Sequence, residues 1–229
     1  MAAHEFLPHV VRPSVTVDIA VLTLIDGALH VLLVERGGRP FIGQLALPGG
    51  FVHVDAGGKG GEPLDDAAAR ELVEETGLSR AQVLLDQVGA FGTPGRDPRG
   101  RVVTVAYFAL VRPELAAFVR AGSDARAARW VRVDEARDLA FDHDRILATT
   151  LARMRADVDR GALALHLAPT TFTIAELREV HEALHGRALD AGNFRRRFLR
   201  LVEQGHVEPA AGKRVTSRKP AKVWRRRAR

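Results

Sequence analysis

The sequence predicts an α/β sandwich followed by a smaller α+β module. In the first 160 residues, runs rich in Val, Ile and Thr alternate with amphipathic helical stretches, which is typical of helices packed on a sheet. The end of the chain instead shows two capped helices and a short β-ribbon. We expect a first domain over residues 1–145, a linker helix over 146–161 and a second domain over 162–229.

The composition limits the class of protein. The chain has 229 residues, is 46% hydrophobic and has no run of eighteen apolar residues, so we expect no transmembrane helix and no membrane partner. The first residues, Met1 to Phe6, lack a basic region followed by an apolar run, so we expect no secretory signal. Cysteine is absent, which excludes disulfides, thiolate zinc sites and cysteine nucleophiles and fits a cytoplasmic protein.

The strands and helices of the first domain follow from apolar patterning and turn residues. Asp26-Gly27 separates two apolar runs and is a strong hairpin signal, because glycine tolerates the positive φ that such turns need. Pro63 and Gly77 bracket a helical pattern. The expected strands are 14–26, 29–35, 83–91, 102–111 and 129–133, and the expected helices are 65–76, 113–121 and 142–160.

The helix that contains Arg70 to Leu78 carries several carboxylates on one side. Glu71, Glu74 and Glu75 are three or four residues apart or adjacent, so their repulsion destabilises the helix by a few tenths of a kcal/mol per pair. A hard cation would remove that repulsion, and Mg²⁺ is commonly held by carboxylates together with substrate phosphates. We therefore expect a metal-dependent diphosphate site, with an acidic surface helix as the alternative.

Basic residues are concentrated at the C-terminus. Residues 195–229 hold 13 Lys and Arg against 2 Asp and Glu, whereas residues 1–194 hold 21 against 26. Such segregation predicts that the C-terminal part binds an anionic polymer. Two alternatives are a disordered basic tail and a basic helical hairpin that docks on the acidic first domain.

Capping signals define the two C-terminal helices. Thr173 and Glu176 form a capping box, and Phe172 with Leu177 forms a hydrophobic staple. This helix is expected to end near Leu184, and a second one, capped by Asp190, to end near Gln204. The pair predicts a helix-turn-helix that binds double-stranded DNA, followed by a β-wing that turns at Ala211-Gly212.

The expected DNA contacts are of two kinds. Arg and Asn on the second helix can read base edges, whereas Lys and Arg of the wing bind phosphates regardless of sequence. The predicted DNA-binding residues are Asn193, Arg195, Arg196, Arg197, Arg200, Lys213, Arg214, Arg218, Lys219 and Lys222.

The carboxylate helix and its flanks resemble the signature of the Nudix hydrolase superfamily. The run Arg70-Glu71-Leu72-Val73-Glu74-Glu75-Thr76-Gly77-Leu78 and Glu62, eight residues before Arg70, match that signature completely. One departure is that eleven residues separate Gly50 from Glu62, where the signature has five. The resemblance implies that Arg70, Glu71, Glu74 and Glu75 are catalytic if the protein is an active hydrolase, and we expect the longer loop to displace Glu62 and slow turnover.

The whole chain, from about residue 14 to 224, resembles the Nudix-related transcriptional regulators of NAD metabolism, the NrtR family. The resemblance rests on residues 47–52, 70–78 and 95–102, and on Phe172-Thr173, Glu176-Leu177, Leu189-Asp190 and Asn193-Phe194-Arg195-Arg196. It implies an α/β Nudix sandwich followed by an α+β winged helix-turn-helix domain. It also implies a homodimeric repressor of NAD biosynthesis or salvage genes, bound to a roughly palindromic operator and released by ADP-ribose or a related NAD metabolite.

Arginines and aromatic side chains are the candidate ligands of that effector. Arginine pairs well with phosphate oxygens, and Phe41 or Phe51 either stacks on the adenine or belongs to the core. The expected effector-binding residues are Arg36, Gly49, Gly50, Phe51, Arg96 and Arg99, and the expected metal ligands are Glu71, Glu74 and Glu75.

Two other functions remain open from the sequence. One is an active, Mg²⁺-dependent ADP-ribose pyrophosphatase that also binds DNA, and the other is a Nudix scaffold without a ligand. Asp142-His143-Asp144 is a possible metal cluster, although aspartates at the start of a helix more often act as caps or interact with the helix dipole.

Overall fold

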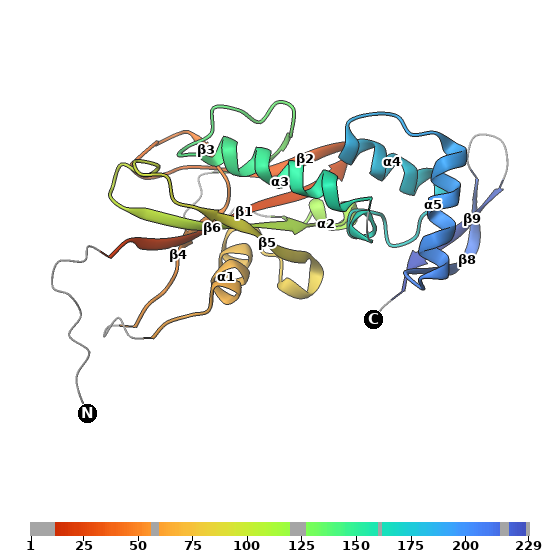
Figure 1. The fold of residues 1–229 in the computed structure, drawn as a ribbon, viewed down its shortest axis with the longest axis horizontal. Helices are drawn as coiled ribbons and strands as arrows, with labels where there is room; N and C mark the ends of the chain where they lie inside the picture. The colour runs from red at the N-terminus through yellow and green to blue at the C-terminus, as the bar shows by residue number, and fades with distance from the viewer. Residues whose placement is uncertain (1–11, 56–59, 120–126, 160–161, 216–219, 228–229) are drawn as a thin grey trace.

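The computed structural model describes residues 12–55, 60–119, 127–159, 162–215 and 220–227 (Figure 1). Two predicted DNA contacts, Arg218 and Lys219, and the centre of the glycine-rich loop lie outside the described residues. No helix in these ranges is long and apolar enough to cross a membrane.

The described residues of the first domain form a mixed seven-stranded sheet. Its strands are β1 (Ser14–Ile25), β2 (Ala28–Glu35), β3 (Leu45–Ala46), β4 (Gly49–Phe51), β5 (Leu84–Phe91), β6 (Val102–Leu110) and β7 (Ala128–Arg132). The main order is β3-β2-β1-β6-β5, with β4 pairing on β1 and β7 on β2, and β1–β6 is a parallel pair. The five predicted strands are confirmed to within about two residues, whereas the short strands β3 and β4 were not predicted.

The β1–β2 hairpin forms at the predicted turn. Asp26 and Gly27 both adopt positive φ, at 50° and 74°, and Ile25 pairs with Ala28 across the turn. Positive φ at both central residues matches the right-handed twist of the two strands. The turn fixes the register that carries β1 through the centre of the sheet.

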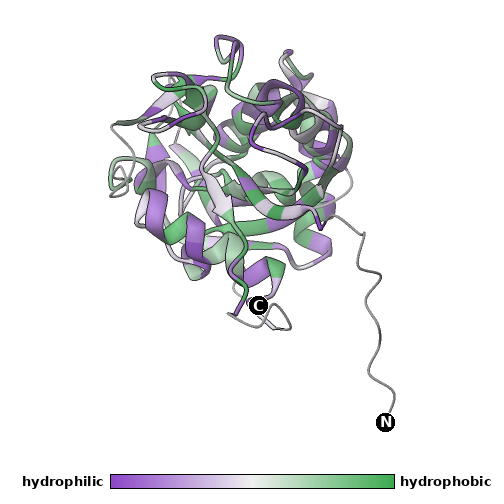
Figure 2. Ribbon diagram, turned by 90° about the vertical axis from the view of Figure 1, so that its left-hand side faces the viewer, coloured by the Kyte–Doolittle hydropathy of each residue, from purple (hydrophilic) through white to green (hydrophobic). Residues whose placement is uncertain are grey.

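One helix covers each face of the sheet, as Figure 1 shows: α1 (Leu64–Thr76) on one side and α3 (His143–Asp157) on the other. Alternate residues of β1 enter the two cores, so Ile19 is buried with Leu72 of α1, while Leu22 is buried with Ile146 of α3. Figure 2 shows mostly apolar strands between helices that carry polar stretches. The α/β sandwich is therefore confirmed, and the predicted linker helix is also part of its packing.

The ends of α1 follow from two residues. Pro63 precedes the first turn, and Gly77 ends the helix in the left-handed conformation with φ of 73°. Proline suits a helix start because its fixed φ is compatible and its missing N–H has no partner there. The helix thus begins and ends within one residue of the prediction.

The helix predicted over residues 113–121 is shorter than expected. It ends after one turn, as α2 (Pro113–Ala116), and residues 120–126 lie outside the described ranges. Phe118 just beyond it is 70% exposed. Most helical stability in proteins comes from a packed apolar face, and the exposed Phe118 contributes little to one. Two short 3₁₀ helices, η1 (Arg80–Gln82) and η2 (Leu163–His166), were not predicted.

The second domain contains α4 (Ile174–His185), α5 (Ala191–Glu203), β8 (Val207–Val215) and β9 (Pro220–Arg226). The predicted capping box is present: the Thr173 hydroxyl accepts from the backbone N–H of Glu176 at 3.2 Å, and the Glu176 carboxylate accepts from the backbone N–H of Thr173 at 2.7 Å. Asp190 caps α5 by accepting from the N–H of Asn193 at 2.8 Å. These local signals define the helix pair, and β8 and β9 form the wing.

The predicted wing turn at Ala211-Gly212 is wrong. Both residues lie within β8, where the register with β9 shifts between Pro209 and Lys213 and Gly212 has φ of 90°. A β-bulge of this kind is where a glycine with positive φ is often found. Gly212 does adopt the positive φ that a turn would need, but it forms an irregularity within β8 rather than the end of the strand.

The two domains share one hydrophobic cluster. Met154 and Val158 at the end of α3 belong to the same buried cluster as Leu177 of α4 and Phe198 of α5. In Figure 1, α4, α5 and the wing lie beyond the end of α3, away from α1. The domains are therefore joined by a packed junction. A shift of α3 against the sheet would alter the packing of α4 and α5.

Candidate effector site and nucleic-acid interface

Arg70 lies at the centre of the carboxylate cluster of α1. Its Nη1 donates to Glu71 at 2.6 Å and to Glu74 at 3.0 Å, and its Nη2 donates to the carbonyl of Phe51 at 3.1 Å. One guanidinium thus offsets the repulsion between these carboxylates and ties α1 to β4. The cluster itself was predicted, and the structure brings its members together.

Glu71 is the buried member of this cluster. Its carboxylate is so close to the backbone of Gly50 that a Cβ at Gly50 would lie 2.3 Å from Oε1, closer than real Cβ contacts allow. Burial raises the pKa of Glu71, while the bond and charge of Arg70 oppose the rise. Glycine at position 50 therefore provides space for a carboxylate that faces the groove beside α1.

Glu62 keeps its place in spite of the longer loop. Its carboxylate accepts from Arg70 Nη2 at 2.7 Å and Nε at 3.1 Å, and from the backbone N–H of His53 at 2.8 Å. Val54 and Gly61 pair across the base of the loop. The described residues give no support to the expected displacement, because Glu62 is bonded to Arg70 of α1 and Val54 pairs with Gly61 just before it.

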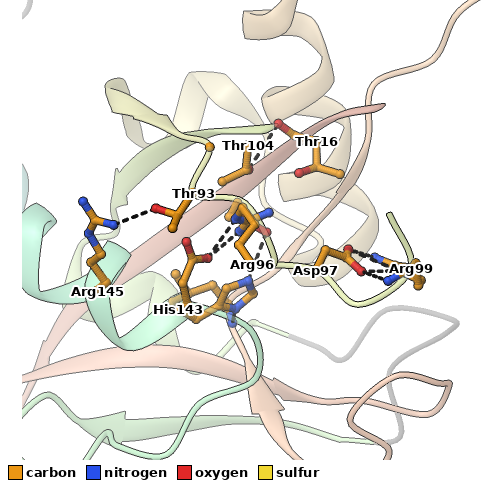
Figure 3. Close-up of polar contacts among 12 residues, drawn as sticks. Thr16, Thr93, Arg96, Asp97, Arg99, Thr104, His143 and Arg145 are labelled. Carbon is orange, nitrogen blue, oxygen red and sulfur yellow. Dashed lines mark hydrogen bonds and ion pairs between the residues drawn. The ribbon is translucent and has the colours of Figure 1, made fainter. Parts of the chain in front are cut away.

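A second polar network is built around Arg96. It lies beside β4, on the side away from Arg70. The Arg96 side chain is only 3% exposed and donates to Asp142 at 2.6 and 2.9 Å and to Asp18 at 3.3 Å (Figure 3). His143 accepts from the N–H of Leu47 through Nδ1 at 2.9 Å, so its Nε2 carries the proton and faces Asp18 at 3.4 Å. Burial raises the pKa of Asp18, but His143, Thr104 and Arg96 lower it below its usual value.

This network changes the roles expected for two residues. Asp142 stands at the N-cap of α3, yet its side chain makes no capping bond and instead binds Arg96. Asp144 accepts from the backbone N–H of Leu139 at 3.0 Å. Arg96 faces the cavity but is already bound by two carboxylates, so its contact with an effector phosphate remains a prediction.

Arg99 and Arg36 lie among aromatic rings. Arg99 pairs with Asp97 at 2.7 Å (Figure 3). Its guanidinium lies 5.1 Å from the ring centre of Phe51, and that of Arg36 lies 4.6 Å from the ring centre of Phe141. Phe51 is 43% exposed, so it is available to stack on a planar ligand rather than buried in the core. Phe41, 37% exposed, packs edge-on against Phe141 at 4.9 Å. Cationic and aromatic groups together suit a nucleotide-like ligand.

Two hollows meet at the Gly49–Phe51 strand. A cavity of about 180 Å³ lies on the side of Arg96, and a groove of about 440 Å³ lies on the side of Arg70. The residues that line both are Arg36, Leu47, Gly49, Gly50 and Phe51. The groove alone is lined by Glu71, Glu74 and Glu75, so the predicted metal ligands and the predicted effector residues border one continuous site.

Sequence reasoning missed several residues of the cavity. Asp18, Asp97, Phe141, His143 and Thr16 all line it. Asp18 had a signal, since it is a charged residue between buried strand positions. Phe141 had none, because only the fold brings it to Arg36.

On α5, four of the five predicted DNA contacts face solvent. Asn193, Arg195, Arg196 and Arg200 are exposed, and Arg196 bonds to the Asn193 side chain. Arg197 differs, because its guanidinium binds Asp159 and the carbonyl of Val158 at the end of α3. The arrangement supports the first four as DNA contacts but gives no support to Arg197.

The wing residues divide in the same way. Lys213 and Lys222 are exposed, with the Lys222 ammonium 4.4 Å from the ring centre of Trp224. Arg214 is bound by Glu176 at 2.6 and 2.7 Å and by Thr171, so it fastens the wing to the start of α4. Arg214 therefore makes a structural contact, and its expected contact with a DNA phosphate remains a prediction.

Comparisons with known proteins agree with both halves of the fold. Residues 15–151 match the model of the NUDIX domain, and residues 164–225 match that of the NrtR DNA-binding winged helix domain. The crystal structure of Shewanella oneidensis NrtR in complex with a 27mer DNA is similar over 93% of each chain, with a TM-score of 0.75 and 29% identity. The Nudix domain of the same protein, crystallised with ADP ribose, is similar over 66% of this chain with a TM-score of 0.55.

Two sequence relatives carry different functions. An "ADPR responsive transcriptional repressor NtrR" of Acinetobacter baylyi is 35% identical over 93% of this chain and 82% of its own length. An "ADP-ribose pyrophosphatase" of Methanocaldococcus jannaschii is 36% identical, but over only 59% of this chain and 72% of its own length. The match over both domains shows that this chain belongs to the NrtR-type Nudix proteins, in which a Nudix domain is joined to a winged helix DNA-binding domain.

Proposed function

We propose that this protein is a transcriptional repressor of NAD biosynthesis or salvage genes, whose Nudix domain senses ADP-ribose or a related NAD metabolite. The observation that carries the proposal is that a carboxylate-lined groove and an exposed arginine helix are joined through one hydrophobic cluster. The groove suits a diphosphate, and the helix suits a DNA groove.

The effector would bind across the Gly49–Phe51 strand. We propose that Glu71, Glu74 and Glu75 hold Mg²⁺, since carboxylate oxygens are its preferred ligands and the missing Cβ of Gly50 makes room for the Glu71 carboxylate, which lines the groove. Bound Mg²⁺ would neutralise the diphosphate. Arg99 and Arg36 would pair with phosphate oxygens, and Phe51 would stack on the adenine.

Binding would reach the DNA through α3. Its first residue, His143, faces the cavity, and its last turn packs on α4, which holds α5. An effector shifts DNA affinity only if it binds two arrangements of this junction unequally. We propose that ADP-ribose favours the arrangement that binds DNA less well.

The proposed active form is a homodimer in the cytoplasm. A symmetric dimer would place two α5 helices about one DNA turn apart, or at multiples of it, and would therefore bind a roughly palindromic operator.

Fluorescence anisotropy tests the proposal directly. The full chain is titrated onto DNA from upstream of NAD-biosynthesis genes and onto a shuffled duplex of equal length, each with increasing ADP-ribose and Mg²⁺. Specific binding that falls as ADP-ribose rises supports the sensor-repressor, provided that AMP and ribose 5-phosphate leave binding unchanged. Specific binding that ignores ADP-ribose would contradict the sensing role and leave only the DNA-binding role.

A second candidate is an ADP-ribose pyrophosphatase, favoured by the complete set of glutamates on α1 and by Glu62 bound to Arg70. We propose that hydrolysis is weak or absent, because the loop between Gly50 and Glu62 is six residues longer than in the Nudix signature and catalytic groups must lie close to their productive geometry. AMP release from ADP-ribose with Mg²⁺ or Mn²⁺ measures this. Substantial release that Glu74→Gln abolishes would contradict the proposal.

A further inference from the structure

Three metal-ligating side chains meet where the two domains join. His181 and His185 are one turn apart on α4, so they project from the same face of the helix. Asp159 follows the end of α3 and reaches the same point. One ligand atom from each of the three lies within 4.8 Å of the other two. The cluster is separate from the carboxylates of α1 and from both hollows of the effector site.

The buried histidine of this cluster has an unused ring nitrogen. His181 is only 1% exposed, and its Nδ1 has no hydrogen-bond partner among the described residues. A buried polar group that is left unpaired is destabilising. His143, the other buried histidine of the described residues, has a partner at each ring nitrogen.

We propose that Asp159, His181 and His185 bind a divalent transition-metal ion of the Zn²⁺ class at the domain junction. Two imidazoles four residues apart on a helix and one carboxylate are a donor set that such ions favour. Ligand atoms at Zn²⁺ distances of about 2.0–2.1 Å are roughly 3.4 Å apart in a tetrahedral site. Binding therefore shortens the wider separations, which reach at most 4.8 Å, and lengthens the 2.8 Å contact between Asp159 and His185 Nε2. The exposed side of Asp159 leaves room for a water as fourth ligand.

The ion would compete with an arginine of the DNA-binding helix. The same Asp159 oxygen that contacts His185 Nε2 at 2.8 Å also accepts from Arg197 of α5. A dication on that oxygen repels the guanidinium and takes over its acceptor. Arg197 also bonds to the carbonyl of Val158 at 3.0 Å, so displacing it alters how α5 is attached to α3. Metal binding is thereby linked to the position of the helix that faces DNA.

Co²⁺ titration of the full chain tests the site, because Co²⁺ bound by histidine gives a visible absorption band. We expect one equivalent to produce the histidine band, and His185→Gln and Asp159→Asn each to weaken the binding that produces it by about 100-fold. Asp159 is about half exposed and His185 is partly buried, so circular dichroism and urea unfolding check that both variants fold. Glu74→Gln is the matched control, since it alters the Nudix carboxylates and leaves the junction intact.

Arg197→Gln provides a second test, because this substitution would change the affinity for Co²⁺ only if Asp159 is a metal ligand. Removing the competing guanidinium is expected to tighten Co²⁺ binding by about tenfold, because Asp159 is then free of a cationic partner. A band that His185→Gln and Asp159→Asn leave unchanged, a band lost only in Glu74→Gln, or no band at millimolar Co²⁺ would each overturn the site. If Arg197→Gln bound Co²⁺ as the wild type does, or more weakly, the proposed competition between the metal ion and Arg197 for Asp159 would be wrong. All of these outcomes are independent of whether ADP-ribose releases DNA.

Discussion

The arginines of the Nudix domain and those of α5 are used in opposite ways. Arg96 is buried and bound by Asp18 and Asp142, whereas Arg195 and Arg196 of α5 face solvent and have no acidic partner among the contacts of the described residues. A buried arginine must be paired, because an uncompensated charge inside a protein is costly. An exposed arginine without an acid leaves its charge for an external anion such as DNA. The neighbours of an arginine therefore reveal more about its role than its residue type.

The largest expected effect comes from breaking the buried network. Arg96→Met leaves Asp18 and Asp142 without their cation, and we expect the free energy of unfolding to fall by about 3 kcal/mol, measured by urea denaturation. Arg132→Met is the control, because Arg132 pairs with Asp134 at the surface and should show no measurable loss. Equal losses in the two variants would break the contrast between buried and exposed arginines.

The Glu62–Arg70 pair predicts a smaller, pH-dependent effect. The bond from Arg70 lowers the pKa of Glu62 from 4.5 to about 2. A lowered pKa in the folded state stabilises the protein above pH 4.5, and this stabilisation is lost as the pH falls towards 2. The difference in unfolding free energy between the wild type and Glu62→Gln should therefore be constant from pH 7 to 5 and shrink below 4.5. A difference that stays constant down to pH 3 would show that the charge of Glu62 contributes nothing.

Local signals predicted more of this molecule than long-range ones. The Asp26-Gly27 hairpin and the Thr173 capping box were predicted because turns and caps depend on residues a few positions apart. The partners of Arg96 were not, because Asp18 and Asp142 are 78 and 46 residues away and meet it only when the sheet forms. The sequence likewise grouped Arg197 with the other arginines of α5, since the position of Asp159 depends on how the domains pack.

The DNA-binding helix offers the next test of the contrast. If Arg195 or Arg196 reads a base edge, its change to Ala should weaken specific binding by about 1–3 kcal/mol and leave the unfolding free energy unchanged. Lys222→Ala should weaken binding to all sequences alike and reduce the salt slope by about one unit. Anisotropy on operator and shuffled DNA at several salt concentrations separates the two behaviours. Equal effects on both duplexes from every substitution would contradict the division into base readers and phosphate contacts.

Arg214 tests the comparison between paired and unpaired arginines. It belongs to the DNA-binding domain, yet like Arg96 it is bound by an acidic residue. Its guanidinium is held by both oxygens of Glu176, which also completes the cap of α4. We expect Arg214→Ala to lower the free energy of unfolding by about 1 kcal/mol, since the pair is only partly shielded from water. Lys213→Ala, one residue away and exposed, should instead leave stability unchanged and weaken DNA binding. If the two variants exchanged these effects in urea denaturation and anisotropy, acidic neighbours would not distinguish structural arginines from those that bind DNA.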